Sequence, residues 1–215
     1  MRIGIIDYGM GNTGSVAAAL RRLGVKPVLA ASEVLLDECA ALILPGVGAF
    51  SPAMERLTHL GLNSAIRRWA DKERKPLLGI CLGMQLLAED STEGYPCRGL
   101  GLIEGHVVRL TPEHTLPVPH VGWNEVHADN ESDLFLDIPP GSHFFFDHSY
   151  HIVLSSSDIN CATFNYGGTW IAAFQRSNVF GVQFHPEKSQ RAGTALLKNF
   201  LRYASVVSAD RYQHA

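Results

Sequence analysis

The residue best suited to covalent chemistry is Cys81, in the segment Leu77-Leu78-Gly79-Ile80-Cys81-Leu82-Gly83. The apolar run before it is typical of a buried parallel strand, and Met84 to Glu89 is typical of a helix. Gly-x-Cys-x-Gly between a strand and a helix predicts a sharp turn, which the glycines permit. The turn would expose the sulfur at a helix N-terminus, where thiolate is favoured. A buried structural cysteine is the alternative, but the flanking glycines favour a nucleophile.

A general base for this nucleophile follows an apolar run much later in the chain, at His185-Pro186-Glu187. In an extended chain, residues two apart point to the same side, so Glu187 should reach the His185 ring. The carboxylate would then hold the imidazole in one tautomer. A solvated turn is the alternative for this motif taken alone. Because strand ends share one crevice in an open parallel sheet, we predict a catalytic triad of Cys81, His185 and Glu187.

Six segments, which run in order from Ile3 to about Leu201, resemble the class I (triad) glutamine amidotransferases. They are Asp7–Asn12, Leu44–Phe50, Gly79–Leu87, Pro119–Asn124, His148–Tyr150 and Gly181–Ser189. Within this class, several are typical of the glutaminase subunits of imidazole glycerol phosphate synthase. The resemblance implies a glutaminase without a cofactor, which hydrolyses glutamine to glutamate and ammonia.

The loop Pro45-Gly46-Val47-Gly48 follows a predicted strand and should open at the same edge as Cys81. Its glycines permit unusual backbone angles, so amides there can face a developing oxyanion; a plain strand-to-helix turn is the alternative. The resemblance implies an oxyanion hole made by the Val47 and Leu82 amides. If the Val47 amide points away at rest, the free chain should be nearly inactive until a partner reorients it.

Glutamine binding is assigned by the resemblance to Gln85, the Gly48 region and the backbone around Ser149 and Tyr150. Gln85 falls one helical turn after Cys81 and on the same face, within reach of the substrate's amino-acid group. Judged without the family, a glutamine here would more often be a helix residue with no ligand.

A partner is also implied, namely a separate (β/α)8 cyclase subunit that forms a heterodimer with this chain. It would use the ammonia to make imidazole glycerol phosphate and an aminoimidazole carboxamide ribotide in histidine biosynthesis. The resemblance places Asn12, Trp123 and Lys188 at the interface. A tryptophan beside glycine is either a core plug or an interface anchor. A phosphate-loop reading of Gly9-x-Gly11-Asn12 is weak, because it lacks the third glycine and the acidic residue.

Asp147 departs from the family, which usually carries valine before His-Ser-Tyr. The partner surface could therefore differ, and the alternative function is a paralogous glutaminase subunit that supplies ammonia to a synthase amidating a nucleotide-activated surface sugar. Two further alternatives are a cysteine peptidase, which would need no partner, and a non-catalytic binding module. The module should lack part of the triad, and all three residues are present.

Composition limits the other function classes. The 215 residues are 46% hydrophobic, which predicts one core in a single domain over 1–207, followed by a loose tail at 208–215. The net charge of −3 predicts no basic face for nucleic acid. Four cysteines without a Cys-x-x-Cys pair indicate a reducing cytosol. No apolar stretch is long enough for a signal peptide or membrane span, so we expect a cytoplasmic protein. His143, His148 and His151 fit no zinc spacing, so we expect no metal.

The elements that must position these residues alternate between strand and helix in the first half. We expect strands at 2–7, 27–30, 41–44 and 77–80, and helices at 13–23 and 52–69. Later strands are expected at 104–110, 121–126, 143–146, 161–166, 170–174 and 179–184, before a closing helix at 194–203. The predicted fold is α/β, a flavodoxin-like doubly wound, mostly parallel sheet with antiparallel strands at one edge.

Overall fold

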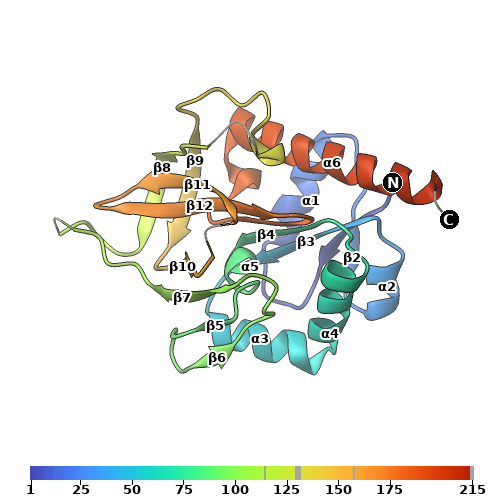
Figure 1. Cartoon of the computed structure of the whole chain (residues 1–215), viewed down its shortest axis with the longest axis horizontal. Helices are drawn as coiled ribbons and strands as arrows, with labels where there is room; N and C mark the ends of the chain where they lie inside the picture. The colour runs from blue at the N-terminus through green and yellow to red at the C-terminus, as the bar shows by residue number, and fades with distance from the viewer. Residues whose placement is uncertain (114, 129–131, 157, 214–215) are drawn as a thin grey trace.

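The computed structural model describes residues 1–113, 115–128, 132–156 and 158–213 (Figure 1). Its main sheet has seven strands in the order β11-β12-β13-β4-β3-β1-β2. The strands from β13 to β2 are parallel, whereas β11, β12 and β13 pair antiparallel at one edge. The order β2-β1-β3-β4-β13 is the flavodoxin-like one, so the predicted fold class is confirmed. The bounds are β1 Ile3–Ile6, β2 Val28–Ala30, β3 Ala41–Gly46, β4 Leu77–Cys81, β11 Asn160–Asn165, β12 Thr169–Arg176 and β13 Val179–Val182.

The central strands are buried because helices cover both faces of the sheet. Every residue of β1, β3, β4 and β13 is buried, as expected for parallel strands with two covered faces. Two helices, α1 (Thr13–Arg22) and α6 (Gln190–Gln213), pack on one face. On the other face lie α2 (Glu33–Asp37), α3 (Phe50–His59) and α4 (Leu62–Arg67), as Figure 1 shows.

Several helices differ from their predicted bounds. The helix expected at 52–69 is divided into α3, α4 and a π-helix, η1 (Arg68–Lys72), because Gly61 adopts a left-handed conformation with φ 69° between α3 and α4. Helix α5 (Leu82–Gln85) is a single turn, so the prediction of a helix to Glu89 is wrong. The tail expected from Ser208 is helical to Gln213, and 214–215 lie outside the described residues. No helix in the described ranges is long and apolar enough to span a membrane.

The strands between β4 and β11 form two further sheets, so the antiparallel pairing predicted for several later strands at one edge of the main sheet is made by β11, β12 and β13. One sheet has the order β10-β7-β5-β6, and β8 and β9 form an antiparallel pair, here called the β8–β9 ribbon. Helix α2 and strands β5, β6 and β10 were not predicted. The bounds are β5 Asp90–Ser91, β6 Cys97–Arg98, β7 Gly105–Arg109, β8 His120–Glu125, β9 His143–His148 and β10 Tyr150–Leu154.

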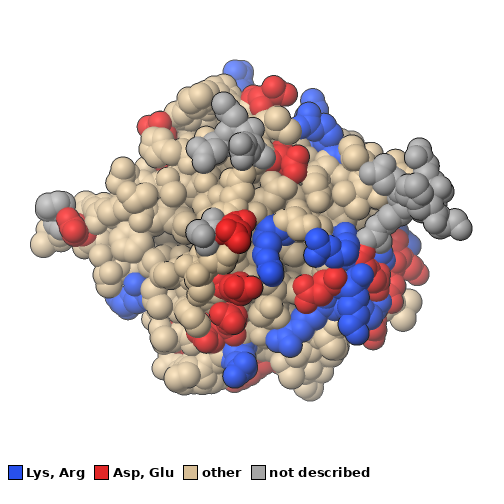
Figure 2. Space-filling model, viewed as in Figure 1, with Lys and Arg blue, Asp and Glu red and all other residues tan. Residues whose placement is uncertain are grey.

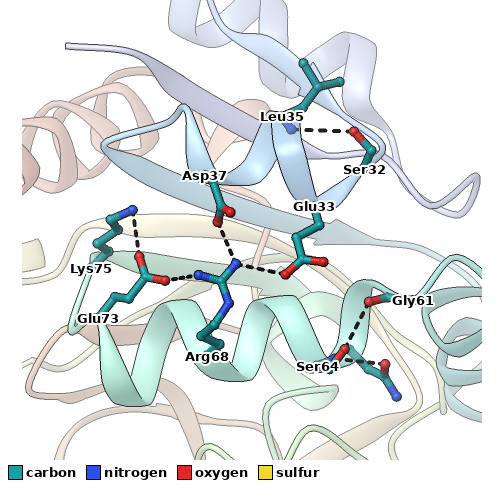
Figure 3. A network of polar contacts seen from close by, with 10 residues as sticks. Ser32, Glu33, Leu35, Asp37, Gly61, Ser64, Arg68, Glu73 and Lys75 are labelled. Carbon is teal, nitrogen blue, oxygen red and sulfur yellow. Dashed lines mark hydrogen bonds and ion pairs between the residues drawn. The ribbon is translucent and has the colours of Figure 1, made fainter.

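A network around Arg68 joins η1 to α2 (Figure 3). The guanidinium lies 2.7 Å from Asp37 and 3.1 Å from Glu33, and it also pairs with Glu73, which Lys75 contacts at 2.8 Å. In Figure 2, charged side chains of both signs intermingle on this part of the surface. Exposed ion pairs contribute little each, so the network adds to packing that α2 already gains from buried Leu36.

Candidate active site

Cys81 occupies the junction of β4 and α5 with φ 54° and ψ −114°, an unusual conformation for a residue with a side chain. The flanking glycines have a different role from the predicted one. A Cβ on Gly79 would lie 2.7 Å from the Met84 nitrogen, and one on Gly83 would lie 1.8 Å from the Leu44 oxygen. The glycines therefore let β3, β4 and α5 approach closely, while the strained backbone angle falls on the cysteine itself.

His185 and Glu187 form a buried pair beside Cys81. The Nδ1 atom of His185 lies 2.8 Å from Oε1 of Glu187, and the two side chains are 4% and 1% exposed. Residues Pro186–Lys188 form a 3₁₀ turn, so Glu187 reaches the ring through this turn and not along an extended chain. Burial disfavours the imidazolium, but hydrogen bonds and negative charge from Cys81 and Glu187 outweigh it and raise the pKa of His185 to about 10.

A pocket of about 290 Å³ opens over the cysteine. It brings together Cys81, His185 and every residue predicted for the oxyanion hole and for glutamine binding, whereas Glu187 stands behind His185. The lining residues are Val47, Gly48, Cys81, Leu82, Gln85, Glu93, Pro119, Asp147, His148, Ser149, Tyr150, His185 and Lys188. Segments far apart in the sequence thus meet at the carboxyl ends of β3 and β4, as the fold class predicts.

Gln85 is buried beneath this pocket and its amide is held on one side. Its Nε2 donates to the Tyr150 carbonyl at 2.8 Å and to Oε1 of Gln183 at 3.0 Å. In turn, Nε2 of Gln183 lies 3.9 Å from the Cys81 sulfur. Gln183 was not predicted, although a glutamine inside an apolar strand run, two residues before His185, is a signal that could have found it.

The loop before α3 is supported by another residue that was not predicted, Tyr8. Its buried hydroxyl donates to the Pro45 carbonyl at 3.0 Å, and burial, with the nearby Cys81 charge, raises the pKa of Tyr8. A Cβ on Gly46 would lie 2.8 Å from that hydroxyl. Gly48 has φ 97°, a conformation that favours glycine, and Val47 between them is 43% exposed.

Glu93 also lines the pocket and was not predicted. Its Oε2 accepts the Phe50 N–H at 2.9 Å, at the first residue of α3. A carboxylate at a helix N-terminus is favoured by the free amides and the helix dipole, so α3 fixes this acid against the pocket.

The residues predicted for the partner interface lie outside the pocket or at its rim. Trp123 is 47% exposed, which excludes the core-plug alternative, and its ring lies edge-on to Phe145 at 5.9 Å. The Lys188 ammonium lies 5.3 Å from the Phe145 ring. Asn12 is exposed and its side chain accepts the Ser15 N–H at 3.1 Å as the N-cap of α1. Asn12 therefore has a structural role as well as a predicted interface role.

The histidines considered for a metal site are dispersed. His148 lies against His120 across the β8–β9 ribbon, with 3.2 Å between Nε2 and Nδ1, while His143 is exposed on the other face. In the described part of the chain, no group of three His, Cys, Asp or Glu side chains is arranged to hold a metal ion.

The chain belongs to the class-I glutamine amidotransferase family, whose model matches residues 4–204. A solved structure of a glutamine amidotransferase superposes with a TM-score of 0.75 at 20% identity, covering 94% of this chain and 98% of that one. A second glutamine amidotransferase, from Thermotoga maritima, superposes with a TM-score of 0.62 at 18% identity, covering 99% and 85%. At these identities the likeness concerns the fold alone.

Proteins similar in sequence to this chain belong to one group within the family. The imidazole glycerol phosphate synthase subunit HisH of Moorella thermoacetica is 48% identical over 198 residues, covering 92% of this chain and 93% of that protein. The subunit HisH of Aquifex aeolicus is 42% identical over 205 residues, covering 95% and 98%. The subunit HisH 1 of Campylobacter jejuni is 42% identical over 200 residues, covering 93% and 99%.

Proposed function

We propose that this chain is the glutaminase subunit of an imidazole glycerol phosphate synthase, with Cys81, His185 and Glu187 as its catalytic triad. The observation that carries the proposal is the buried His185–Glu187 pair, 2.8 Å apart, beside a cysteine on a strained strand-to-helix turn. Family membership and the names of relatives more than 40% identical over nearly the whole chain support the same activity.

The mechanism follows from the positions of these groups. His185 takes the Cys81 proton, and the thiolate attacks the side-chain amide of glutamine. The Val47 and Leu82 amides stabilise the tetrahedral oxyanion, and the His185 imidazolium protonates the departing ammonia. Water then hydrolyses the γ-glutamyl thioester to glutamate. A pKa of His185 near 10 fits an imidazolium that stands beside the thiolate before the attack.

Glutamine occupies the pocket over Cys81, held by Gln85, Gly48 and the backbone of Ser149 and Tyr150. The amide hydrogens of Gln85 are engaged by Tyr150 and Gln183. Its Oε1 is therefore the atom left to accept a hydrogen bond from the ammonium end of the substrate. The Glu93 carboxylate, on the same pocket, adds negative charge that attracts the ammonium group of the substrate.

The ammonia passes to a (β/α)8 cyclase subunit bound as a heterodimer, because in water it would be protonated and lose its nucleophilicity. We place the docking surface on the outer face of the β8–β9 ribbon, defined here as Val121, Trp123, Phe145 and Asp147, together with Asn12 and Lys188. Val121 is 56% and Trp123 47% exposed, and exposed aromatic groups of this kind anchor interfaces. The cysteines are free thiols, which supports a reducing cytoplasmic location.

One observation favours a different acceptor for the same ammonia. Asp147 places an exposed carboxylate on the docking surface, where the family usually carries an apolar side chain. In that case the chain would serve a synthase that amidates a nucleotide-activated surface sugar. Reconstitution with the cyclase and with such a synthase decides between them, since only the true partner should turn glutamine hydrolysis into amidated product.

The deciding experiment for the proposed chemistry is Cys81→Ala in the assembled complex. It should abolish glutamine-dependent synthesis while leaving synthesis from added ammonium salts intact, because ammonia made elsewhere still reaches the acceptor. Rates with glutamine and with ammonium chloride are measured in parallel. Equal loss of both activities would assign Cys81 a structural role and end the proposal.

A further inference from the structure

Two histidines that face each other across the β8–β9 ribbon, His148 at the pocket wall and His120 behind it, form the centre of a series of linked hydrogen bonds. His120 and His148 are direct partners in the strand register and both are buried. Their rings point inward among aromatic side chains, because alternate residues of a strand face opposite sides. His120 stacks on Phe164 with ring centroids 5.2 Å apart and lies 4.0 Å from Tyr166. The proposed reaction uses neither histidine.

The backbone carbonyl of Tyr150 determines the direction of each hydrogen bond that links it to His148, His120 and Asn124. The Tyr150 oxygen can only accept, so Nδ1 of His148, 2.8 Å away, must carry a hydrogen and donate. In a neutral imidazole the other nitrogen then accepts, so Nδ1 of His120 must donate to it across 3.2 Å. Nε2 of His120 is left as an acceptor, and Asn124 Nδ2 lies 3.4 Å from it.

The amide of Asn124 is itself fixed in the orientation that this series needs. Its Nδ2 donates to the Asn165 carbonyl at 2.8 Å, and its Oδ1 accepts the Glu125 N–H at 2.8 Å. Both rings are neutral at physiological pH, since burial lowers the pKa of His120 to about 4 and of His148 to about 3. Donors and acceptors therefore match from Asn124 to Tyr150.

The series ends on the carbonyl that also holds Gln85. The Tyr150 oxygen accepts from His148 on one side and from Gln85 on the other, each at 2.8 Å. These two bonds use both lone pairs of the oxygen. This oxygen is then not available to the substrate, which leaves the other backbone atoms of Ser149 and Tyr150 for glutamine binding, and its role is to fix the Gln85 amide so that Oε1 faces the ligand.

We propose that His120 and His148 are positioning residues for glutamine, which act through the Tyr150 carbonyl on the orientation of the Gln85 amide. The inference rests on the proposed glutaminase function. Gln85 meets the amino-acid end of glutamine, away from the amide that is cleaved, so its orientation affects substrate and transition state alike. Loss of such uniform binding raises KM and leaves kcat unchanged.

The kinetic test uses His120→Phe, which keeps a ring among Phe146, Phe164 and Tyr166 but removes the donor to His148. In the assembled complex, KM for glutamine should rise about ten-fold, the scale of one lost buried hydrogen bond, with kcat within about two-fold of wild type. The matched control is His151→Phe. His151 is equally buried, but its ring donates to the Ile152 carbonyl and takes no part in the hydrogen bonds that link Asn124 to Tyr150. Its KM should stay at the wild-type value.

His148 gives a second pair of variants. His148→Leu should raise KM as His120→Phe does, whereas His148→Asn can again place an N–H near the Tyr150 carbonyl and should recover most of that loss. Ammonium-dependent synthesis should be retained in all variants, and co-elution of each variant with the cyclase in size-exclusion chromatography checks that the complex still assembles. A wild-type KM in His120→Phe, or an equal rise in His151→Phe, would overturn the inference.

A measurement on the wild-type chain needs neither activity nor a folded variant. Long-range ¹H–¹⁵N spectra at pH 7 should show both His120 and His148 as neutral Nδ1–H tautomers. An Nε2–H tautomer or a protonated ring at either residue would overturn the inference, whatever the complex does with glutamine. If instead both tautomers are as expected but the wild-type complex releases no ammonia from glutamine, the proposed function fails and the series of hydrogen bonds stands.

Discussion

The pocket has one wall formed by the β4–α5 turn and another formed by the β8–β9 ribbon with residues 148–150, and the two are held by different forces. The first wall is packed backbone against backbone, with a would-be Cβ on Gly83 only 1.8 Å from a β3 carbonyl. The second is held by polar side chains, from Asn124 through two histidines to Tyr150. Backbone packing sets the position of Cys81, whereas the second wall depends on a series of hydrogen-bonded side chains.

The most drastic way to break the first wall is Gly83→Ala. The new methyl group would overlap the Leu44 oxygen, and backbone cannot move aside as a side chain can, so we expect loss of the folded protein or at least about 3 kcal/mol of unfolding free energy. Urea unfolding followed by circular dichroism measures it. The matched control is Gly14→Ala on the exposed face of α1, where nothing lies within 4 Å of the new methyl group; it should be neutral or slightly stabilising. Similar curves for the two variants would refute the steric account.

The next largest effect is expected at the His185–Glu187 pair, beside the Cys81 turn. His185→Ala should damage glutamine turnover more than Glu187→Gln, because in the proposed mechanism His185 transfers protons and Glu187 only orients it. Loss of an orienting carboxylate still costs up to about 10⁴-fold in a triad. Glutaminase rates of both variants in the complex, measured from pH 6 to 10, give the answer. Full turnover of Glu187→Gln across that range would remove Glu187 from the triad.

Docking of the partner tests the second wall, because the proposed docking surface lies on the β8–β9 ribbon. It should also act on the loop that carries exposed Val47. A single oxyanion donor changes a rate by roughly 10² to 10³, so we expect the cyclase to raise glutaminase turnover by at least that order. Ammonia release by the purified chain is measured with and without the cyclase and its ligand. Full activity of the chain alone would contradict this and favour an independent amidase.

Two variants locate the docking surface in the same assay. Trp123→Ala should weaken assembly, with a higher cyclase concentration needed for half-maximal activation, and should leave the isolated fold stable. Val34→Ala removes another exposed apolar side chain, from α2, at the opposite end of the molecule from the β8–β9 ribbon in Figure 1. It should not change the concentration that is needed.

The smallest expected effect is a pH dependence of stability that comes from the second wall. The pKa values of His120 and His148 are lowered on folding, so their neutral forms stabilise the native state above about pH 6.5, and this contribution is lost as the pH falls towards 4. The unfolding free energy should fall by about 1 kcal/mol per pH unit for each of the two histidines in that window. His120→Phe should show a shallower slope. A wild-type stability that is flat from pH 7 to 5 would contradict the assignment.

The first wall was predictable from the sequence because its determinants are local. A strand, a Gly-x-Cys-x-Gly turn and a one-turn helix follow one another along the chain, and the strand order of the parallel sheet brings His185 to the same edge. The predicted physical reasons were less accurate than the predicted positions. The glycines serve close packing, and Glu187 reaches His185 through a 3₁₀ turn.

The second wall was not predictable in the same way, because its contacts are tertiary. Strand β10 was missed since only Ser149 separates it from β9, with no glycine or proline to mark the boundary. Nothing in the sequence divides the later strands among three sheets. His120 and Gln183 stand in otherwise apolar surroundings, and their hydrogen-bond partners lie 28 and 98 residues away along the chain.

The backbone angle at Cys81 has an evolutionary consequence. A non-glycine residue held at φ 54° carries a conformational strain of about 1 to 3 kcal/mol, a cost that glycine at the same place would not incur. With Cys81 as the proposed nucleophile, selection for glutamine hydrolysis maintains a residue that selection for folding alone would replace. A lineage released from the need for this activity should lose its nucleophile early, with a gain in stability, while Gly79 and Gly83 persist because the fold itself requires them.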